Sequence, residues 1–415
     1  MSLVDAVTSA FVERAGRRPD GVWRAPGRVN LIGEHTDYND GFVLPVAIDR
    51  SVVVAAGRRD DDVLRCWSTG DRTAPVPRRL AELGPGSSSG WSAYVEGVAW
   101  ALLQEGRPVP GADLVVHADL PAGAGLSSSA ALEAAAALAF TELAAAGPAA
   151  DPVSGGDVAA APPNGRAASG DGAAAPPPDR VALALAGQRA ETEVVGMPCG
   201  LMDQMVVLTG RAGHALFFDT RTLATEQVPF DPAAAGLTLL VIDTRVKHTL
   251  AGSPYAERRR ACERAAAALG VAALRDASLD DLDAALSTGR LDDVTFRRAR
   301  HVVTENARVL EVVALLRRGE VAAIGPALAG SHRSLRDDYE VSCPELDVAV
   351  ETAVAAGAVA ARMTGAGFGG SALALVPEGA ADGVAPAVAE AFAAHGFGPP
   401  AVFPVAVSDG AARLA

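Results

Sequence analysis

The sequence predicts an α+β protein built from two domains. Its 415 residues exceed the usual size of one domain, and a composition of 49% apolar and 21% charged residues is sufficient for two hydrophobic cores. Stretches with strand-like alternation and stretches with helical spacing occur in both halves of the chain. We place the N-terminal domain at residues 1–210 and the C-terminal domain at 211–415, whose last strands can return to the first domain.

In the N-terminal half, the pattern gives two strands, a helix, a third strand and a long helix. Residues 22–33 and 42–57 are rich in β-branched side chains and are separated by the polar turn HTDYNDG. Residues 91–103 have helical apolar spacing. Residues 113–146 are predicted to form a strand, a glycine-rich loop and a helix that begins within a run of three serines.

Residues 147–179 differ in composition from the rest of the chain. They are mostly Ala, Gly, Pro, Ser and Asp, which cannot bury enough apolar surface to offset the entropy of ordering. We expect a flexible insert, and a structured linker is the alternative. Helical spacing resumes in RVALALAGQRAETEVVG, which begins at residue 180.

The second half has both strand and helix signals. Strands are expected in GHALFFDT, LTLLVIDTRV, VAARMTG and SALALV, and several helices rich in Arg and Glu are expected between residues 254 and 330. The last two strands flank a glycine-rich loop.

The charge and the apolar runs exclude some classes of protein. A net charge of −14 gives no general attraction to nucleic acids or anionic membranes. The N-terminus lacks the pattern of a signal peptide. Two Ala-rich runs, 131–146 and 348–361, are interrupted by Glu133, Glu142 and Glu351, so we expect amphipathic helices there and no membrane spans. The four cysteines are far apart, which favours neither a zinc site nor disulfides, and we expect a cytoplasmic protein.

Lysine is almost absent. The chain contains a single one, Lys247, in the context TRVKHT. P-loop enzymes and protein kinases place a lysine on the nucleotide phosphates within characteristic motifs, and neither motif is present. A phosphate-handling enzyme with this sequence must therefore use another scheme.

Four segments carry candidate chemistry. The first, GRVNLIGEHTDY, concentrates Arg28, Glu34, His35 and Asp37 around a turn, which suits a polyhydroxylated ligand, although a solvated turn with a structural ion pair would have the same pattern. The second, PAGAGLSSSA, lies between a strand and a helix. Its glycines would allow backbone N–H groups to approach a phosphate, and its serines can bind phosphate oxygens or Mg²⁺. An ordinary helix cap is the alternative.

The third segment, MTGAGFGG, contains a literal GxGxxG. A dinucleotide-binding fold requires a helix next, but a strand-like segment follows, which argues against an oxidoreductase. A loop near the phosphates and a simple hairpin turn both remain possible for this segment.

The fourth segment is GMPCGLMDQ, preceded by Glu191 and Glu193 on a predicted helix. Asp203 is its candidate general base, and a helical Glu is a candidate Mg²⁺ ligand, although exposed charges or helix caps would look the same.

Taken together, the four segments resemble the galactokinases of the GHMP kinase superfamily. The first is similar to the galactokinase signature, the second to the superfamily's phosphate loop and the third to its glycine motif. WSAYVEGV, SPYAERRRACE and SHRSLRDDYEVSCPELD are also galactokinase-like. The resemblance implies an N-terminal domain like the second domain of ribosomal protein S5, a ferredoxin-like C-terminal domain, and an active site in the cleft between them.

The resemblance also assigns roles to residues. Arg28 and Asp203 would be the catalytic pair. The sugar would be held by Glu34, His35, Asp37, Gly200 and Tyr255. ATP would be bound by Gly123, Ala124, Gly125, Leu126, Ser127, Ser128 and Ser129, with Trp91 and Tyr94 beside the adenine. Ser129 and Glu191 would be the Mg²⁺ ligands.

The implied reaction is transfer of the γ-phosphoryl group of ATP to the anomeric C1 hydroxyl of galactose. The sequence leaves the oligomeric state open, and a monomer is the default expectation. A related kinase acting on N-acetylgalactosamine or arabinose is one alternative. A sugar sensor without activity is another, but the presence of Arg28 and Asp203 argues against it. A carboxylate with an ordinary pKa of about 4 cannot ionise a sugar hydroxyl in advance, so Asp203 would take the proton as the bond to phosphorus forms.

Overall fold

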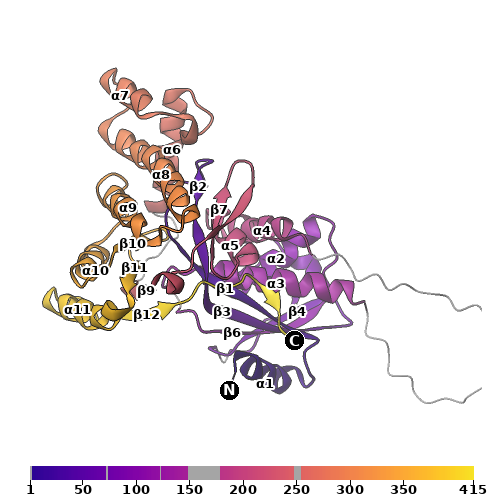
Figure 1. Ribbon diagram of the computed structural model, residues 1–415. Coiled ribbons are helices and arrows are strands. Elements are labelled where there is room, and N and C mark those ends of the chain that lie inside the picture. Colours follow the sequence, from indigo (N-terminus) through magenta and orange to yellow (C-terminus); the bar gives the residue numbers. More distant parts are fainter. Residues whose placement is uncertain (1, 72, 122, 148–177, 247–253) are drawn as a thin grey trace, which may run out of the picture.

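The computed structural model describes residues 2–71, 73–121, 123–147, 178–246 and 254–415. Two domains, each built around a sheet, lie next to one another, and helices α6 and α7 of the second domain extend away from the first (Figure 1). The mixed two-domain architecture predicted from the sequence is confirmed. The expected insert falls outside the described residues except at its ends, so its flexibility stays a prediction.

The N-terminal domain contains a six-stranded sheet in the order β13-β1-β3-β6-β4-β5. Neighbouring strands are antiparallel except for β4 and β6, which are parallel. The strands are β1 (Gly21–Asn30), β3 (Pro45–Arg58), β4 (Val63–Ser68), β5 (Arg78–Arg79), β6 (Ala112–Ala118) and β13 (Ala412–Arg413). Strand β13 brings the end of the chain back to β1, with which it pairs antiparallel.

Both faces of this sheet are covered by helices. Since alternate side chains of a strand point to opposite faces, neighbouring residues of β1 enter different cores. Trp23 packs into the larger core with α3, and the adjacent Val22 packs with Val7 and Phe11 of α1. The helices of this domain are α1 (Leu3–Ala15), α2 (Ser92–Gln104), α3 (Ser128–Ala145), α4 (Arg180–Arg189) and α5 (Met202–Thr209).

The expectation of an amphipathic helix at residues 131–146 was wrong. Helix α3 packs against β1 and β3 on one side and against α2, α4 and α5 on others, so it is buried nearly all round. Its small alanines allow this close packing. Glu133 consequently lies in the interior, fully buried, instead of on a solvated face.

A three-stranded sheet in the order β2-β7-β8 connects the halves of the chain. It consists of β2 (Phe42–Val43), β7 (His214–Asp219) and β8 (Thr225–Pro229). Strand β2 follows directly after the polar turn of the first motif, and it pairs with β7 from beyond residue 210. The boundary that we proposed near residue 210 falls between α5 and β7. At this place the two halves of the chain are joined by the backbone hydrogen bonds between β2 and β7.

The C-terminal domain contains an antiparallel sheet in the order β10-β11-β9-β12. Its strands are β9 (Leu237–Asp243), β10 (Ala360–Thr364), β11 (Ser371–Pro377) and β12 (Ala401–Val405). Its helices are α6 (Pro254–Leu269), α7 (Leu279–Ser287), α8 (Asp293–Arg317), α9 (Gly325–Asp337), α10 (Pro344–Ala355) and α11 (Ala381–Ala394). The Ala-rich run 348–361, expected to be one helix, is the end of α10 followed by the start of β10, because a glycine turn at Gly357 separates them.

Two expectations about the whole chain can be compared with the described residues. None of the helices within the described ranges combines the length and the apolar character that a membrane span requires. The four cysteines, Cys66, Cys199, Cys262 and Cys343, are free thiols in the structure.

Candidate active site

The site residues predicted from the sequence converge on one cavity of about 730 Å³. Its wall is formed by residues of both halves of the chain, from the first motif and phosphate loop on one side to Tyr255 and the glycine loop of residues 365–370 on the other. Of the predicted site residues, Ala124 alone does not line it. Ala124 belongs to the phosphate loop but is buried, and its carbonyl oxygen accepts a hydrogen bond of 2.7 Å from Ser371 Oγ.

Arg28 and Asp203 form a two-point ion pair within this cavity. Arg28 is on β1 and Asp203 is in the first turn of α5, 175 residues later. Arg28 Nε and Nη2 each donate to a different oxygen of Asp203, both at 2.7 Å. Ser127 Oγ also donates to Asp203, and Arg28 Nη1 donates to the carbonyl of Gly125 at 2.6 Å. The guanidinium therefore fixes both the carboxylate and the phosphate loop.

The phosphate loop leaves the N-terminus of α3 open to the cavity. Gly123 and Gly125 have φ values of +79° and +73°, a left-handed conformation that glycine adopts without strain. Ser127, also left-handed at +57°, precedes α3 but does not cap it, because its hydroxyl is used by Asp203. The first N–H groups of the helix are thus available to an anion. This disfavours the alternative that the serines are an ordinary helix cap.

The glycine loop between β10 and β11 is both a hairpin turn and a wall of the cavity. It joins two antiparallel strands, as the hairpin interpretation predicted. It also packs on the phosphate loop, since a side chain at Gly365 would come within 3.4 Å of the Gly125 carbonyl oxygen. A side chain at Gly370 would lie equally close to the carbonyl oxygen of Ala124. Gly365 and Gly370 also have φ values of +84° and +74°, so it is mainly this left-handed conformation that favours glycine where the two loops touch.

Glu34 is held mainly by protein groups. It is 2% exposed, and its carboxylate accepts from Asn30 Nδ2 at 2.8 Å and from the backbone N–H of Gly365 at 2.8 Å. Arg362 Nη1 lies 2.6 Å from Glu34 Oε2 and is itself fully buried. Burial raises the pKa of Glu34 to about 7, against the opposing effect of the Arg362 charge. Glu34 therefore joins the first motif to the C-terminal domain.

His35 has partners for both of its ring nitrogens. Nδ1 lies 2.8 Å from the Tyr38 hydroxyl, and Nε2 lies 3.2 Å from the carbonyl oxygen of Ala366. Because a carbonyl only accepts, the Nε2 contact places the proton on Nε2 and leaves Nδ1 to accept from Tyr38. Burial lowers the pKa of His35 to about 3, so the ring is neutral. Its ring also packs near Tyr255, with centroids 5.6 Å apart.

Asp37 is the carboxylate of the first motif that remains open to the cavity. Its hydrogen bonds come from backbone N–H groups, those of Asp37 and Met202, and the charge of Asp203 is close. Burial and then the Asp203 charge raise the pKa of Asp37 to about 6. Gly200 makes room for it, since a Cβ at this position would fall 1.7 Å from Asp37 Oδ2.

Ser129 and Glu191 lie together at the opposite end of the phosphate loop from Gly123. Glu191 is in the short π-helix Ala190–Val195, and the Ser129 hydroxyl hydrogen-bonds to its carboxyl group. Burial and the nearby Asp203 raise the pKa of Glu191 to about 7. Gln204 Nε2 bridges Glu191 and Glu133, at 2.9 and 3.0 Å. The described residues contain no cluster of three His, Cys, Asp or Glu side chains suited to a metal.

Trp91 and Tyr94 lie at the start of α2 and line the same cavity. Two buried residues that support the site without lining the cavity were missed in the sequence. Arg362 is a charged residue within the apolar strand β10, and Glu133 is a charged residue within the Ala-rich helix α3. A charge in such an apolar stretch was the one signal in the sequence that could have identified them. Their partners, Glu34 and Gln204, are 328 and 71 residues away in the chain, so no local pattern could identify them.

Comparisons with known proteins agree with this geometry. The chain matches the galactokinase galactose-binding signature over residues 9–58, the GHMP kinase N-terminal domain over 93–161 and the GHMP kinase C-terminal region over 312–394. It is 49% identical to a galactokinase of Streptomyces coelicolor over 413 residues, covering 100% of this chain and 99% of the relative. It is 40% identical to a human galactokinase over 381 residues, covering 90% of this chain and 88% of the relative.

Solved structures give the same result. A Lactococcus lactis galactokinase complexed with galactose superposes with a TM-score of 0.87 at 30% identity, and the match covers both chains completely. A mevalonate kinase, at 14% identity and a TM-score of 0.61 over 94% of this chain and 99% of its own, shares the fold. The chain belongs to the galactokinase family of the GHMP kinases, and it is an ATP-dependent sugar kinase.

Proposed function

We propose that this chain transfers the γ-phosphoryl group of ATP to the anomeric C1 hydroxyl of α-D-galactose, giving galactose 1-phosphate and ADP. The observation that carries the proposal is the two-point pair between Arg28 and Asp203. It lies between a phosphate loop with an open helix N-terminus and the turn that carries Asp37. A proton acceptor, an anion site and a hydroxyl-binding carboxylate therefore face one cavity.

Asp203 is the proposed general base. Its carboxylate is oriented by Arg28 and by Ser127, which limits the directions from which a substrate hydroxyl can approach. As the oxygen of the sugar bonds to phosphorus, Asp203 accepts its proton. The Arg28 guanidinium, which also donates to Gly125 of the phosphate loop, offsets negative charge at the transferred phosphoryl group.

The residues near the phosphate loop fit a Mg²⁺ ion. Mg²⁺ in kinases is usually held by one or two protein ligands together with substrate phosphates, so a site with Ser129 and Glu191 alone is sufficient. Glu191 has no cationic partner among the described residues. When bound, the ion would neutralise charge on the ATP phosphates. Ser129 and Glu191 are proposed to hold it, and Gln204 to orient the Glu191 carboxylate.

Galactose is proposed to bind beside Asp37, Gly200 and Tyr255, with the adenine next to Trp91 and Tyr94. Asp37 is the carboxylate with free capacity to accept hydroxyl hydrogen bonds. Glu34 and His35 already have protein partners, and they are proposed to give the pocket its shape while contributing what hydrogen-bonding capacity remains. The Lactococcus lactis relative with galactose bound supports this choice of sugar.

The test is a coupled assay of ADP release over galactose, glucose, N-acetylgalactosamine and arabinose, with the product identified by phosphorus NMR. Galactose should be by far the best substrate and should give an anomeric phosphate. Glucose differs from galactose at the C4 hydroxyl alone, so efficient turnover of glucose would contradict the assignment. Preference for N-acetylgalactosamine or arabinose would favour a related kinase, and sugar binding without ADP release would favour a sensor.

We further propose that the enzyme works as a monomer in the cytoplasm. The proposed catalytic, sugar and nucleotide residues, apart from Ala124, line one cavity of this chain, which favours a site within a single copy. The four free thiols suit a reducing compartment. Light scattering after size-exclusion chromatography would give the oligomeric state.

A further inference from the structure

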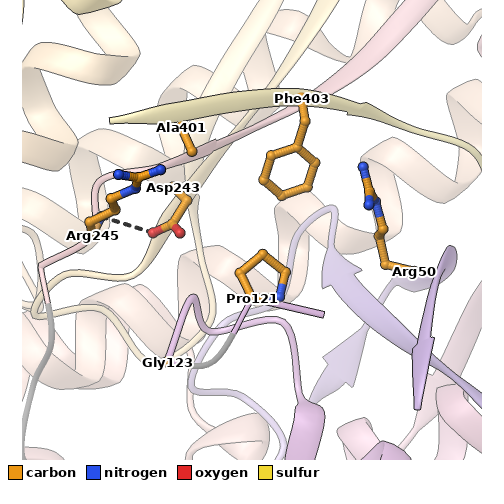
Figure 2. A pocket seen from close by; sticks show the side chains of 7 residues that line it. All are labelled: Arg50, Pro121, Gly123, Asp243, Arg245, Ala401 and Phe403. Carbon is orange, nitrogen blue, oxygen red and sulfur yellow. Dashed lines mark hydrogen bonds between the residues drawn. The ribbon is translucent and has the colours of Figure 1, made fainter. Parts of the chain in front are cut away.

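A second cavity, of about 380 Å³, lies beside the phosphate loop. Figure 2 shows its lining residues, which come from strand β3, the start of the phosphate loop with the proline before it, the end of strand β9 with the segment that follows, and strand β12. They are Arg50, Pro121, Gly123, Asp243, Arg245, Ala401 and Phe403. Gly123 alone among them also lines the active-site cavity. The second cavity is therefore a neighbour of the active site and not a part of it.

Two arginines give this cavity positive charge. Within the described part of the chain, neither the Arg50 nor the Arg245 guanidinium takes part in an ion pair. Arg50 is positioned over the Phe403 ring, at 5.3 Å from its centroid. In a protein with a net charge of −14, two unpaired guanidinium groups on one cavity form a local site for an anion.

Arg245 is held in an unfavourable backbone conformation. Its φ is +59°, which costs free energy for a residue with a side chain. The conformation is maintained by Asp243, whose Oδ1 accepts from the Arg245 N–H at 2.8 Å (Figure 2). Asp243 is 7% exposed, and its second carboxylate oxygen remains available as an acceptor on the cavity wall. Strain of this kind is typical of positions with a binding role.

We propose that this cavity binds a sugar monophosphate. Guanidinium groups are well suited to phosphate oxygens, Asp243 can accept from sugar hydroxyls, and Phe403 with Pro121 offers an apolar surface for one face of a pyranose ring. Inorganic phosphate would leave the acceptor and the apolar surface unused. The volume is at the small end of the range for ligand pockets, which favours a monosaccharide derivative over a nucleotide.

The position of the cavity connects it to nucleotide binding. Thr244 donates to the Gly370 carbonyl through its N–H at 3.0 Å and its hydroxyl at 2.7 Å. Gly370 lies against Ala124 of the phosphate loop. A phosphate bound near Gly123 would also repel the phosphates of ATP. Occupation of the second cavity should therefore weaken nucleotide binding by several-fold.

The test is calorimetry on the full chain with the active site already filled by galactose, Mg²⁺ and a non-hydrolysable ATP analogue. Galactose 1-phosphate and glucose 6-phosphate are then titrated, with inorganic phosphate and free galactose as comparisons. Both sugar phosphates should bind at one site per chain and more tightly than either comparison. R50Q and R245Q should each weaken them about tenfold, the usual effect of losing a charge-assisted hydrogen bond. R333Q, which removes an exposed arginine of α9, is the matched control.

A second titration measures the affinity of the analogue with and without glucose 6-phosphate. The several-fold weakening should appear in the wild type and in R333Q and should disappear in R50Q. Absence of sugar phosphate binding to the filled enzyme, or equal binding in R50Q, R245Q and R333Q, would overturn the site. Unchanged affinity of the analogue would overturn the coupling. Both titrations are read without turnover, so they do not depend on catalysis, and prior calorimetry showing that galactose and the analogue bind establishes that the active site is filled.

Discussion

Asp37 Oδ2 lies 1.7 Å from the position that a Cβ of residue 200 would occupy, so the placement of this cavity-lining carboxylate depends on a glycine 163 residues away in the chain. G200A should displace Asp37 and weaken galactose binding by at least tenfold, while ATP affinity changes little. Calorimetry with each ligand measures both. G383A, in α11 where a Cβ meets no atom within 4 Å, is the control and should bind galactose normally. Normal galactose affinity in G200A would show that Asp37 does not contact the sugar.

The proposed general base can be separated from its role in binding. D203N nearly keeps the shape of the side chain but removes the proton acceptor, so turnover should fall by about a hundredfold or more while galactose and ATP still bind. Steady-state kinetics and calorimetry on one preparation decide this. In D203N, the Arg28 guanidinium keeps an acceptor for only one of its two hydrogen bonds to residue 203. R28K is a useful second variant, because lysine keeps the positive charge but cannot make the two-point contact. Turnover close to the wild-type value in D203N would exclude the base role.

Nucleotide binding should depend on the phosphate loop. In G125V the new side chain would be strained, at φ +73°, and would obstruct the approach of phosphate, so ATP binding should be lost. G86V provides a matched control, because Gly86 has φ +75° and its Cβ would meet nothing within 4 Å. Equal loss in both variants would indicate general misfolding.

Lys247, which lies outside the described residues, is expected to be dispensable, and K247A should retain a large part of the activity.

The titration of Asp37 should be visible in the stability of the ligand-free enzyme. Its pKa is raised to about 6 in the folded state from an ordinary value of 3.8, so the folded protein holds this proton more tightly than the unfolded chain does. The resulting stability is complete below about pH 4 and is lost as the pH rises through 6. D37N lacks this dependence. The unfolding free energy of the wild type relative to D37N should therefore fall by on the order of 1 kcal/mol between pH 4.5 and 7, as measured by urea unfolding. A constant difference would contradict the shift.

The buried pair of Glu34 and Arg362 should behave as a unit. R362M would leave Glu34 without its cation inside the protein and should reduce the free energy of unfolding by about 3–5 kcal/mol. The double variant E34Q/R362M should lose less than R362M alone, because no uncompensated charge remains. Urea unfolding of both variants and of E34Q completes the cycle. Additive losses would show that the two side chains do not interact.

Much of the fold could be predicted from the sequence, because its signals are local. Strand alternation around Trp23 and helical spacing after Trp91 each depend on neighbours in the chain, and both elements form where expected. The glycines of the phosphate loop were also identifiable, since only glycine takes their left-handed conformation without strain. Where burial overrides local pattern, as for α3, the prediction failed, because Glu133 resembles an exposed residue until the surrounding helices are known.

The sequence by itself therefore determined the elements, the motifs and the residue types available for chemistry. The tertiary structure decided which of these residues remain available to a substrate. Glu34, His35 and Asp37 look alike in the sequence, but packing of the C-terminal domain gives the first two protein partners and leaves Asp37 open. The physical reason is that hydrogen-bonding capacity is limited: an atom bound to Gly365 or Ala366 is no longer free for a sugar, and those partners are more than 300 residues away.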